Sequence, residues 1–358
     1  MYIVQTAFDK SSQPVKPIAS IVCNLETKKI KFYILYSKSH SQKLSEVDDK
    51  IKELFDILSN NNIALNDYKS HLMFFNIKSS HNIYETMQQD FDVRKNTTID
   101  DIKSILKKEL SDTIKNGVAK KWQELAADAT SVYLELQNRG VVVCDTLMHP
   151  EYELTTFSGR SKSLVFGIQS ASENDDIKHV NDRYDLYVCA DWMAADLRAL
   201  SLLSCDKDLQ STFLSSDPYT HAASILNISK DEAKIELLRD INSLNFTSKM
   251  GQVYPVLYQW LHKSLDDLNK NRYLESILGR RFNLQDDNFK TVFNAIAQGS
   301  VAHAMHHSLY RLHYEMGPQI LTELHDSIIV CCNAQSLKNT ISRISSIMLH
   351  PFVSILES

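Results

Sequence analysis

Two short apolar segments stand far apart in the chain, and each of them meets an aspartate. Residues 186–190 run into Asp191, and residues 328–332 follow Asp326 after one intervening serine. Runs of this length that are rich in β-branched residues are typical of buried strands. Side by side, two such carboxylates form an oxygen ligand set for Mg²⁺, which also binds substrate phosphates. Taken alone, an aspartate at a strand end is more often a turn or helix-cap residue.

The composition limits the class of fold that surrounds these segments. The 358 residues are enough for about two domains, and 43% hydrophobic with 23% charged residues is a globular composition. Only 8 glycines and 7 prolines are present, which excludes collagen-like, linker-rich and turn-rich all-β chains and favours helix. The formal charge of -5 argues at first against a nucleic-acid partner, since such domains are usually basic.

The first residues and the cysteines bear on targeting and on the redox environment. The first residues lack a basic stretch followed by an apolar run, so we expect no signal peptide, and no run approaches the roughly 20 apolar residues of a membrane span. None of the six cysteines forms a C-x-x-C pair, so we expect reduced thiols and a cytoplasmic location. The six are Cys23, Cys144, Cys189, Cys205, Cys331 and Cys332.

Apolar periodicity predicts an N-terminal α/β module followed by helices. Residues 99–138 have helical spacing with a lysine-rich side, which is either a solvated face or a phosphate-contacting one. Beyond residue 155 the pattern alternates between strands and helices. The predicted strands of the first part are 2–4, 18–22, 30–35, 71–75 and 141–144, with a helix over 45–60.

The residues around the two aspartates resemble signature motifs of family A DNA polymerases, the bacterial polymerase I and phage replicase family. Residues 191–198 resemble motif A, D-Y-S-x-x-E-L-R, and residues 324–327 resemble motif C, which contains H-D-E. Further segments follow in the family's order, so the resemblance covers about 150–335. They are 155–161 (T-x-T-G-R-L-S), 165–169 (N-L-Q-N-I-P), 217–221 (D-x-H-T), 273–281 (V-E-T-x-x-G-R-R) and 294–302 (N-x-P-I-Q-G-x-x-A).

The resemblance implies an α+β fold: a right-hand polymerase palm with an antiparallel sheet and helical fingers, preceded by a small RNase H-like α/β module. It implies a degenerate 3′–5′ exonuclease-like domain over 1–95, a helical connector over 96–140 and a palm over 141–358, with fingers at about 206–283. The family's thumb is expected to be absent, because only 144–154 separate the strand at 140–143 from the T-x-T-G-R-L-S segment.

The same resemblance implies the roles of individual residues. Asp191 and Asp326 are the expected catalytic residues and the ligands of two Mg²⁺ ions, for which Mn²⁺ could substitute, and the Trp192 carbonyl completes the metal shell. Contacts to primer–template DNA are expected from Arg160, Asn294, Gln298, His325, Arg280 and Arg281. From the residues alone, Arg160 could equally be a surface charge, Gln298 a helix-packing amide, and His325 a residue that orients Asp326.

The expected nucleotide-binding residues depart from the family. Its fingers helix reads R-x-x-x-K-x-x-x-F-x-x-x-Y-G, with all four side chains on one face. Here Phe246 is retained, and Arg239 and Lys249 stand one residue off that face, where we expect them to recover part of the phosphate binding. Asp196 replaces the glutamate of the family's ribose gate, so we expect a looser gate. The family's Arg, Lys and Tyr positions hold Leu238, Asn242 and Met250.

The N-terminal module resembles an RNase H-like exonuclease domain less closely. The segments 64–71 and 83–87 stand where the family has N-x-K-Y-D and D-T-M. The first acidic motif would fall at 5–7, which holds no carboxylate, and His71 holds a ligand position, so we expect no proofreading. Without a thumb we expect low processivity, unless a partner protein or the basic stretch 99–123 substitutes for it.

Three functions remain open on these residues. The first is a template-directed DNA polymerase that uses deoxynucleoside triphosphates and a primed template, and a phage or mobile element acting in the host cytoplasm would suit its reduced architecture. The alternative is a catalytically decayed, polymerase-like DNA-binding or scaffold protein. The third is a phage-type RNA polymerase, since these also read H-D-S at motif C. Residues 151–358 carry 19 Lys+Arg against 25 Asp+Glu, so we expect weak, salt-sensitive DNA binding.

Overall fold

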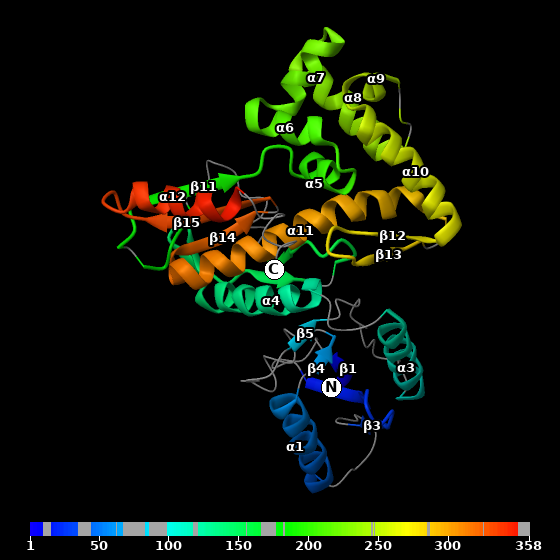
Figure 1. The fold of residues 1–358 in the computed structure, drawn as a ribbon. Helices are drawn as coiled ribbons and strands as arrows, with labels where there is room; N and C mark the ends of the chain where they lie inside the picture. Colours follow the sequence, from blue (N-terminus) through cyan, green and yellow to red (C-terminus); the bar gives the residue numbers. More distant parts are fainter. Residues whose placement is uncertain are drawn as a thin grey trace. The chain divides into compact units, whose positions relative to one another are not determined.

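The computed structural model divides into two compact units, whose helices and strands are drawn in Figure 1. One unit holds residues 1–138 and 152–156, and the other holds 139–151 and 157–358. No helix among the described residues is long and apolar enough to cross a membrane. The described residues are 1–9, 16–34, 44–61, 63–66, 83–85, 99–116, 121–154, 156–165, 177–181, 183–244, 246, 248–284, 287–324 and 326–349.

A five-stranded sheet forms the centre of the first unit, in the order β3-β2-β1-β4-β5. The pairs β1–β2 and β2–β3 are antiparallel, whereas β1–β4 and β4–β5 are parallel. The first three predicted strands are therefore present, while 71–75 lies outside the described residues. The bounds are β1 (Tyr2–Asp9), β2 (Lys16–Asn24), β3 (Ile30–Ile34), β4 (Ile63–Leu65) and β5 (Ile83–Glu85).

Helices cover both faces of this sheet. The first packs Leu54 into a core with Val4, and the second packs Leu106 into a core with Ile3. Neighbouring residues of a strand point to opposite faces, so the two helices lie on opposite sides of the sheet. The apolar stripe of the lysine-rich helix is thus buried within this unit. The helices of the first unit are α1 (Leu44–Asn60), α3 (Ile99–Asn116) and α4 (Lys121–Arg139).

Uncharged polar side chains occupy the opening strand where the exonuclease family has its first acidic motif. The Gln5 amide donates to Thr113 Oγ1 on α3 at 3.1 Å, and the Thr6 backbone N–H donates to Asn66 Oδ1 at 2.8 Å. Thr6 Oγ1 also shares a hydrogen bond with Ser20 Oγ at 2.8 Å. All five side chains are buried, and neutral hydrogen bonds join these positions of the sheet.

The second unit opens with a tight hairpin, β6 (Val141–Val143) and β7 (Thr146–Met148), and β10 (Ile177–Lys178) pairs with β6 on its other edge. The two turn residues, Cys144 and Asp145, have φ of 46° and 61°, as a two-residue type I′ turn requires. Residues 141–148 thus form a tight β-hairpin. Next along the chain are β8 (Glu151–Glu153), most of which belongs to the first unit, and β9 (Lys162–Val165).

An antiparallel three-stranded sheet, in the order β11-β15-β14, carries both aspartates. The register of β11 and β15 sets Asp191 opposite Ser327. Along β11 the exposed positions alternate with half-buried ones, so Tyr187, Cys189 and Asp191 share one open face. The bounds are β11 (Leu186–Asp191), β14 (Ile320–Leu324) and β15 (Ser327–Cys332), with the single turn η2 (Gly317–Gln319) before β14 and α12 (Leu337–Met348) after β15.

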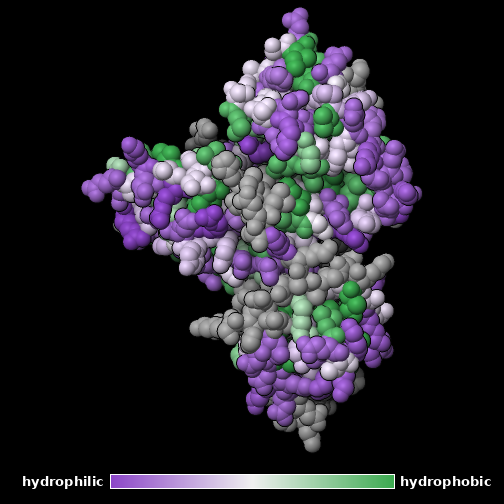
Figure 2. All heavy atoms as spheres, viewed as in Figure 1, coloured by the Kyte–Doolittle hydropathy of each residue, from purple (hydrophilic) through white to green (hydrophobic). Residues whose placement is uncertain are grey.

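Six helices follow Asp191 in the chain before the long helix α11. Asp206, Asp217 and Ser229 begin three of them, and each side chain accepts from backbone N–H groups of the first turn. Their apolar sides share one core with α11, and Figure 2 shows mainly hydrophilic side chains over the outer side of α10. The six are α5 (Ala195–Leu203), α6 (Lys207–Ser215), α7 (Pro218–Leu226), α8 (Lys230–Ser243), α9 (Ser248–Val253) and α10 (Pro255–Asn271).

The stretch that aligns with the family's nucleotide-binding helix is not one helix here. α8 ends at Ser243, and Leu244 adopts the left-handed conformation with φ of 57° before α9 begins at Ser248. A left-handed residue is a common way for a helix to end. Phe246 lies between the two helices, so the single helical face on which the sequence comparison relied does not exist across 238–250.

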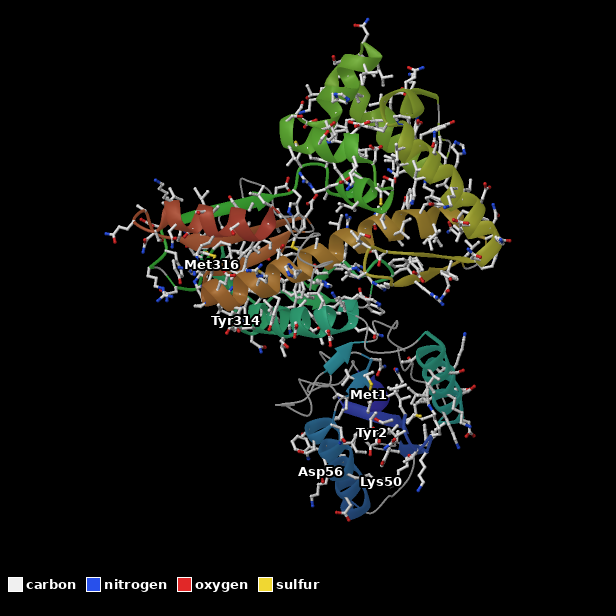
Figure 3. The ribbon with its side chains drawn as sticks, in the orientation of Figure 1. Met1, Tyr2, Lys50, Asp56, Tyr314 and Met316 are labelled. Atoms are coloured by element: carbon white, nitrogen blue, oxygen red, sulfur yellow. The ribbon has the colours of Figure 1, made fainter. Side chains whose placement is uncertain are left out.

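α11 (Phe289–Met316) is the longest helix described, and it packs against α5, α8 and the ribbon of β12 (Tyr273–Glu275) and β13 (Arg281–Asn283). Most of its residues between 292 and 309 are buried. At its C-terminal end Tyr314 is 84% exposed, whereas Met316 is buried (Figure 3). The helix is therefore a central element of the second unit rather than a surface one.

Gly299→Ala is expected to destabilise the second unit by about 1–3 kcal/mol. A Cβ on Gly299 would lie 2.6 Å from Phe282 Cζ and 3.1 Å from the Ser158 carbonyl oxygen, so a buried ring and a backbone segment would both have to move. Urea unfolding of the variant and the wild type measures the loss. Gly251→Ala is the control, because its Cβ would come no closer than 3.3 Å to the Tyr258 ring. A Gly299→Ala protein as stable as the wild type would contradict this account of the packing.

Candidate active site

The two aspartates meet at one end of the β11-β15-β14 sheet. Asp191 is the last residue of β11, and Asp326 lies in the short connection between β14 and β15. The Trp192 N–H donates to the Asp326 carbonyl oxygen at 3.3 Å, which joins the two segments beyond the last strand pair. The Trp192 indole donates to the Met348 carbonyl oxygen at 2.9 Å and is buried, so this segment is anchored to α12.

The electrostatics of this pair favour a bound cation. Burial raises the pKa of the Asp191 carboxyl, and the negative charge of Asp326 raises that pKa further. A divalent cation between the carboxylates would remove this repulsion. No group of three or more His, Cys, Asp or Glu side chains that could hold a metal was found in the described part of the chain. Mg²⁺ needs only one or two carboxylates with substrate phosphates, so the pair fits Mg²⁺ and does not fit structural zinc.

Asp196, in the first turn of α5, belongs to the same charged group. Arg160 Nη2 donates to Asp196 Oδ1 at 3.0 Å, and both side chains are partly buried. Burial raises the pKa of the Asp196 carboxyl, the Arg160 charge lowers it, and the Asp326 charge raises it. Three carboxylates and one guanidinium therefore act on one another at the end of this sheet, and the sequence comparison had given all four a role.

Packing and hydrogen bonds fix the segment that carries Arg160. The Arg280 guanidinium donates to the Phe157 carbonyl oxygen at 3.0 Å, and the Phe157 and Phe282 rings meet edge to face at 5.6 Å. On the other side of Arg160, Ser161 Oγ donates to Glu323 Oε2 on β14 at 2.5 Å. These contacts hold the arginine against α5 from two sides.

The other two arginines expected at DNA, Arg280 and Arg281, occupy different environments. Arg280 is only 8% exposed, its guanidinium stacks on Phe282 at 4.9 Å, and burial lowers its pKa to about 10, so it remains charged at neutral pH. Arg281 is exposed, pairs with Glu275 at 2.8 Å and lies over the Tyr273 ring at 4.4 Å. Arg281 is thus accessible to a ligand, while Arg280 is an interior residue that supports the Arg160 segment.

The remaining expected contacts lie on or near α11 and in the connection before β15. Asn294 and Gln298 are one turn apart on α11, and both are half-buried. His325 lies outside the described residues. Asn294 and Gln298 therefore share a side of the helix, as their four-residue spacing predicts.

The expected nucleotide-binding residues do not converge as the sequence suggested. Phe246 is buried in the core that the helices α5 to α11 share, with the His262 and Phe293 rings at 5.2 and 6.1 Å. Arg239 and Lys249 come together, but on a shared carboxylate: both pair with Glu236 of α8, Lys249 at 3.4 Å. Glu236 was not singled out from the sequence, although its position three residues before Arg239 is typical of a helical ion pair.

Comparisons with known proteins concern the fold. Neither a protein-family model nor a curated protein sequence matches the chain. Among solved structures, the POL domain of Pol1 from M. smegmatis, in complex with DNA primer-template and dNTP, matches with a TM-score of 0.62. The match covers 97% of this chain and 92% of that chain at 11% sequence identity. The predicted α+β, polymerase-like fold with its antiparallel sheets is confirmed.

Proposed function

We propose that this chain is a template-directed DNA polymerase that adds deoxynucleotides to the 3′ end of a primer. The observation that carries the proposal is the pair of Asp191, at the end of β11, and Asp326, just before the neighbouring antiparallel strand β15, whose backbones are joined by the 3.3 Å hydrogen bond from the Trp192 N–H to the Asp326 carbonyl oxygen. The raised pKa of Asp191 supports a cation site between them. The motif order along the sequence, and the likeness to a polymerase domain solved with primer-template DNA and dNTP, support the same function.

In this proposal Asp191, Asp326 and the Trp192 carbonyl hold two Mg²⁺ ions. When bound, such ions activate a primer 3′-hydroxyl and stabilise the leaving pyrophosphate in an in-line displacement at the α-phosphate. The strands fix the two carboxylates, and the Trp192 indole fixes the backbone between them through Met348. Asp196 lies beside the incoming ribose as a looser gate than glutamate, and Arg160 balances its charge.

The proposed primer–template contacts are those of Arg160, Arg281, Asn294, Gln298 and His325. Arg160 and Arg281 each pair with a carboxylate of the chain, so DNA has to compete with Asp196 and Glu275 for them. This competition and the acidic excess of the second half predict weak binding that declines steeply with salt. Arg280 contributes by positioning the Arg160 segment.

For the nucleotide we propose contacts from Phe246, Asp196, Arg239 and Lys249. Since Glu236 already pairs with both cations, phosphate binding by Arg239 and Lys249 requires them to leave this carboxylate. Such an exchange costs part of the binding free energy, so a high KM for nucleotide is expected from these two residues.

The domain division is proposed as before: an exonuclease-like domain without proofreading over 1–95, a connector over 96–140, and a palm over 141–358 with fingers at about 206–283. The neutral hydrogen bonds of Gln5 and Thr6 support the absence of nuclease chemistry. The tight hairpin at 140–148 supports the absence of a thumb, for which a partner protein would substitute.

Primer extension tests the proposal. The purified protein is given a labelled primer on a longer template, with Mg²⁺ or Mn²⁺ and deoxynucleoside triphosphates at low salt, and products are resolved to single nucleotides. Short, template-dependent extension is expected, and no extension at millimolar nucleotide and low salt would contradict it. A parallel reaction with ribonucleotides tests the looser gate, and their strict exclusion would remove that idea.

The second candidate is a polymerase-like DNA-binding or scaffold protein that has lost its chemistry. The ion pairs of Glu236 with Arg239 and Lys249 favour it, because they neutralise the cations that would hold a triphosphate. Template binding without any nucleotide addition would decide for this function. A phage-type RNA polymerase, the third candidate, predicts extension with ribonucleotides in preference to deoxynucleotides.

Alkylation of Cys189 is expected to reduce primer extension at least about tenfold. Cys189 is exposed and lies two residues before Asp191 on the same face of β11, about 7 Å along the strand. Iodoacetamide treatment followed by the extension assay measures the loss. Cys189→Ser should be resistant, whereas Cys144→Ser and Cys205→Ser, which remove the other exposed thiols, should stay sensitive. Equal sensitivity of Cys189→Ser would show that this face is not used.

A further inference from the structure

Lys234 and Tyr219 form a contact that the sequence comparison did not single out. Lys234 Nζ lies 5.9 Å from the centre of the Tyr219 ring. Lys234 belongs to the exposed side of α8 and Tyr219 to the first turn of α7, and these two helices pack together (Figure 1). Among the described residues, no carboxylate pairs with the Lys234 ammonium, and none accepts or donates a hydrogen bond at the Tyr219 hydroxyl.

Tyr219 connects this contact to the carboxylates of the candidate active site. Tyr219 and Ala233 share a core cluster with Leu197, which directly follows Asp196 on α5. Burial and then the negative charge of Asp196 raise the pKa of Tyr219 to about 12, so the hydroxyl keeps its proton and can donate to an anion. Asp196 in turn pairs with Arg160 at 3.0 Å. Lys234 therefore contacts a tyrosine whose hydroxyl is close enough to the candidate active site for the Asp196 charge to act on it.

The position of Lys234 on α8 compensates for a residue that is missing. Leu238 stands where the resembling family has its phosphate-binding arginine, and Lys234 precedes Leu238 by four residues. Residues four apart lie on the same side of a helix, one turn from each other. A lysine can extend along the helix, so its ammonium can serve a ligand one turn away.

The charge balance also favours Lys234 over the two cations predicted from the sequence. Arg239 and Lys249 share the Glu236 carboxylate, which leaves one net positive charge for three ionised groups. Lys234 has no such partner among the described residues. A phosphate therefore meets less competition at Lys234 than at Arg239 or Lys249.

We propose that Lys234 and Tyr219 bind the phosphates of the incoming nucleoside triphosphate, the ammonium as a point charge and the hydroxyl as a hydrogen-bond donor. This inference rests on the proposed polymerase function, and it adds two residues from α7 and α8 to the nucleotide site. It also explains how a phosphate site could remain although Leu238 stands where the resembling family has an arginine.

The test measures nucleotide binding directly and through catalysis. Equilibrium binding of a deoxynucleoside triphosphate and of the corresponding monophosphate is measured with Mg²⁺, and KM and kcat for the triphosphate come from primer extension. Lys234→Ala is expected to weaken triphosphate binding and raise KM about tenfold with a smaller effect on kcat, while monophosphate binding stays unchanged. Tyr219→Phe should raise KM about threefold. Lys234→Gln keeps the side-chain stem on the Tyr219 ring and removes only the charge.

Lys263→Ala is the control, because it removes the same charge from an exposed position on α10. If the wild type extends primers and Lys234→Ala has an unchanged KM, this inference is overturned and the polymerase function stands. If the wild type binds triphosphate through Lys234 but extends no primer, the phosphate site is supported and the polymerase function fails. If the wild type neither binds triphosphate nor extends primers, both are overturned.

Discussion

Asp326→Asn is expected to reduce primer extension at least about 1000-fold, which corresponds to about 4 kcal/mol of transition-state stabilisation. The residue supplies one of the two carboxylates that close the end of the β11-β15-β14 sheet, and asparagine keeps its shape but removes its charge. With one carboxylate left, the site would no longer hold the two divalent ions that the proposed mechanism needs. Asp191→Asn should have a loss of the same order.

The stability of these variants distinguishes a catalytic role from a structural one. The Asp326 charge raises the pKa of Asp191, so the wild-type pair is mutually repulsive. Removing either charge relieves that repulsion, and Asp326→Asn should unfold at the wild-type temperature or slightly above it. Mg²⁺ should raise the unfolding temperature of the wild type and leave that of the variant unchanged, because only the wild type binds the ion.

Asp266→Asn is the matched control for this experiment, because it makes the same substitution at an exposed position on α10. It should retain full extension and the Mg²⁺ response. An Asp326→Asn protein that extends primers within tenfold of the wild type would remove the two-carboxylate mechanism. A variant that fails to fold would instead show that the carboxylate is structural.

The parts of the fold that the sequence predicts are those where local patterns and tertiary packing agree. The apolar segments 186–190 and 328–332 are both strands, and their aspartates meet because the two strands are sheet neighbours. Residues 328–332 are mostly buried as expected, whereas 186–190 expose Tyr187 and Cys189 on one face. The helix over 45–60 and the three opening strands were likewise predicted, from the spacing of their apolar residues and from turn residues between them. The Arg160–Asp196 contact joins residues that only the family resemblance had linked.

Two kinds of feature were not predicted from the sequence. One is the backbone conformation of single residues, and the other is which side chain forms an ion pair with which. Leu244 takes a left-handed conformation, and no glycine or asparagine marks the end of α8 at that position. Glu236 turns two expected phosphate ligands into an ion-pair cluster, and only its three-residue spacing to Arg239 hints at this. The burial of Arg280 could have been predicted from the sequence. Arg280 precedes Phe282 by two residues, so the alternation of an extended chain directs both side chains inward.

The second large effect is expected in acid, from two buried histidines of α11. His303 and His306 are 1% and 2% exposed, and burial, with the nearby Arg280 charge, lowers the pKa of His306 to about 4 and that of His303 well below its usual value. Below pH 6.5 the unfolded chain binds protons at these residues and the folded chain does not, so the free energy of unfolding falls as the pH decreases. Each group contributes up to about 1.4 kcal/mol per pH unit, and His306 alone roughly 3 kcal/mol between pH 6.5 and 4.

Urea unfolding at pH 7.5, 6.5, 5.5 and 4.5 measures this slope, and His306→Gln should make it shallower by about 1.4 kcal/mol per pH unit relative to the wild type. His313→Gln, on the same helix but only partly buried, is the control for the removal of a histidine from α11. Arg280→Met provides an independent arm: the Arg280 charge opposes protonation of His306, so its removal should shift the titration of His306 upward, as measured by NMR. An unchanged slope in His306→Gln would mean that this histidine accepts its proton in the folded protein. In that case the charge of the buried Arg280 would oppose the protonation of His306 less than its position near His303 and His306 implies.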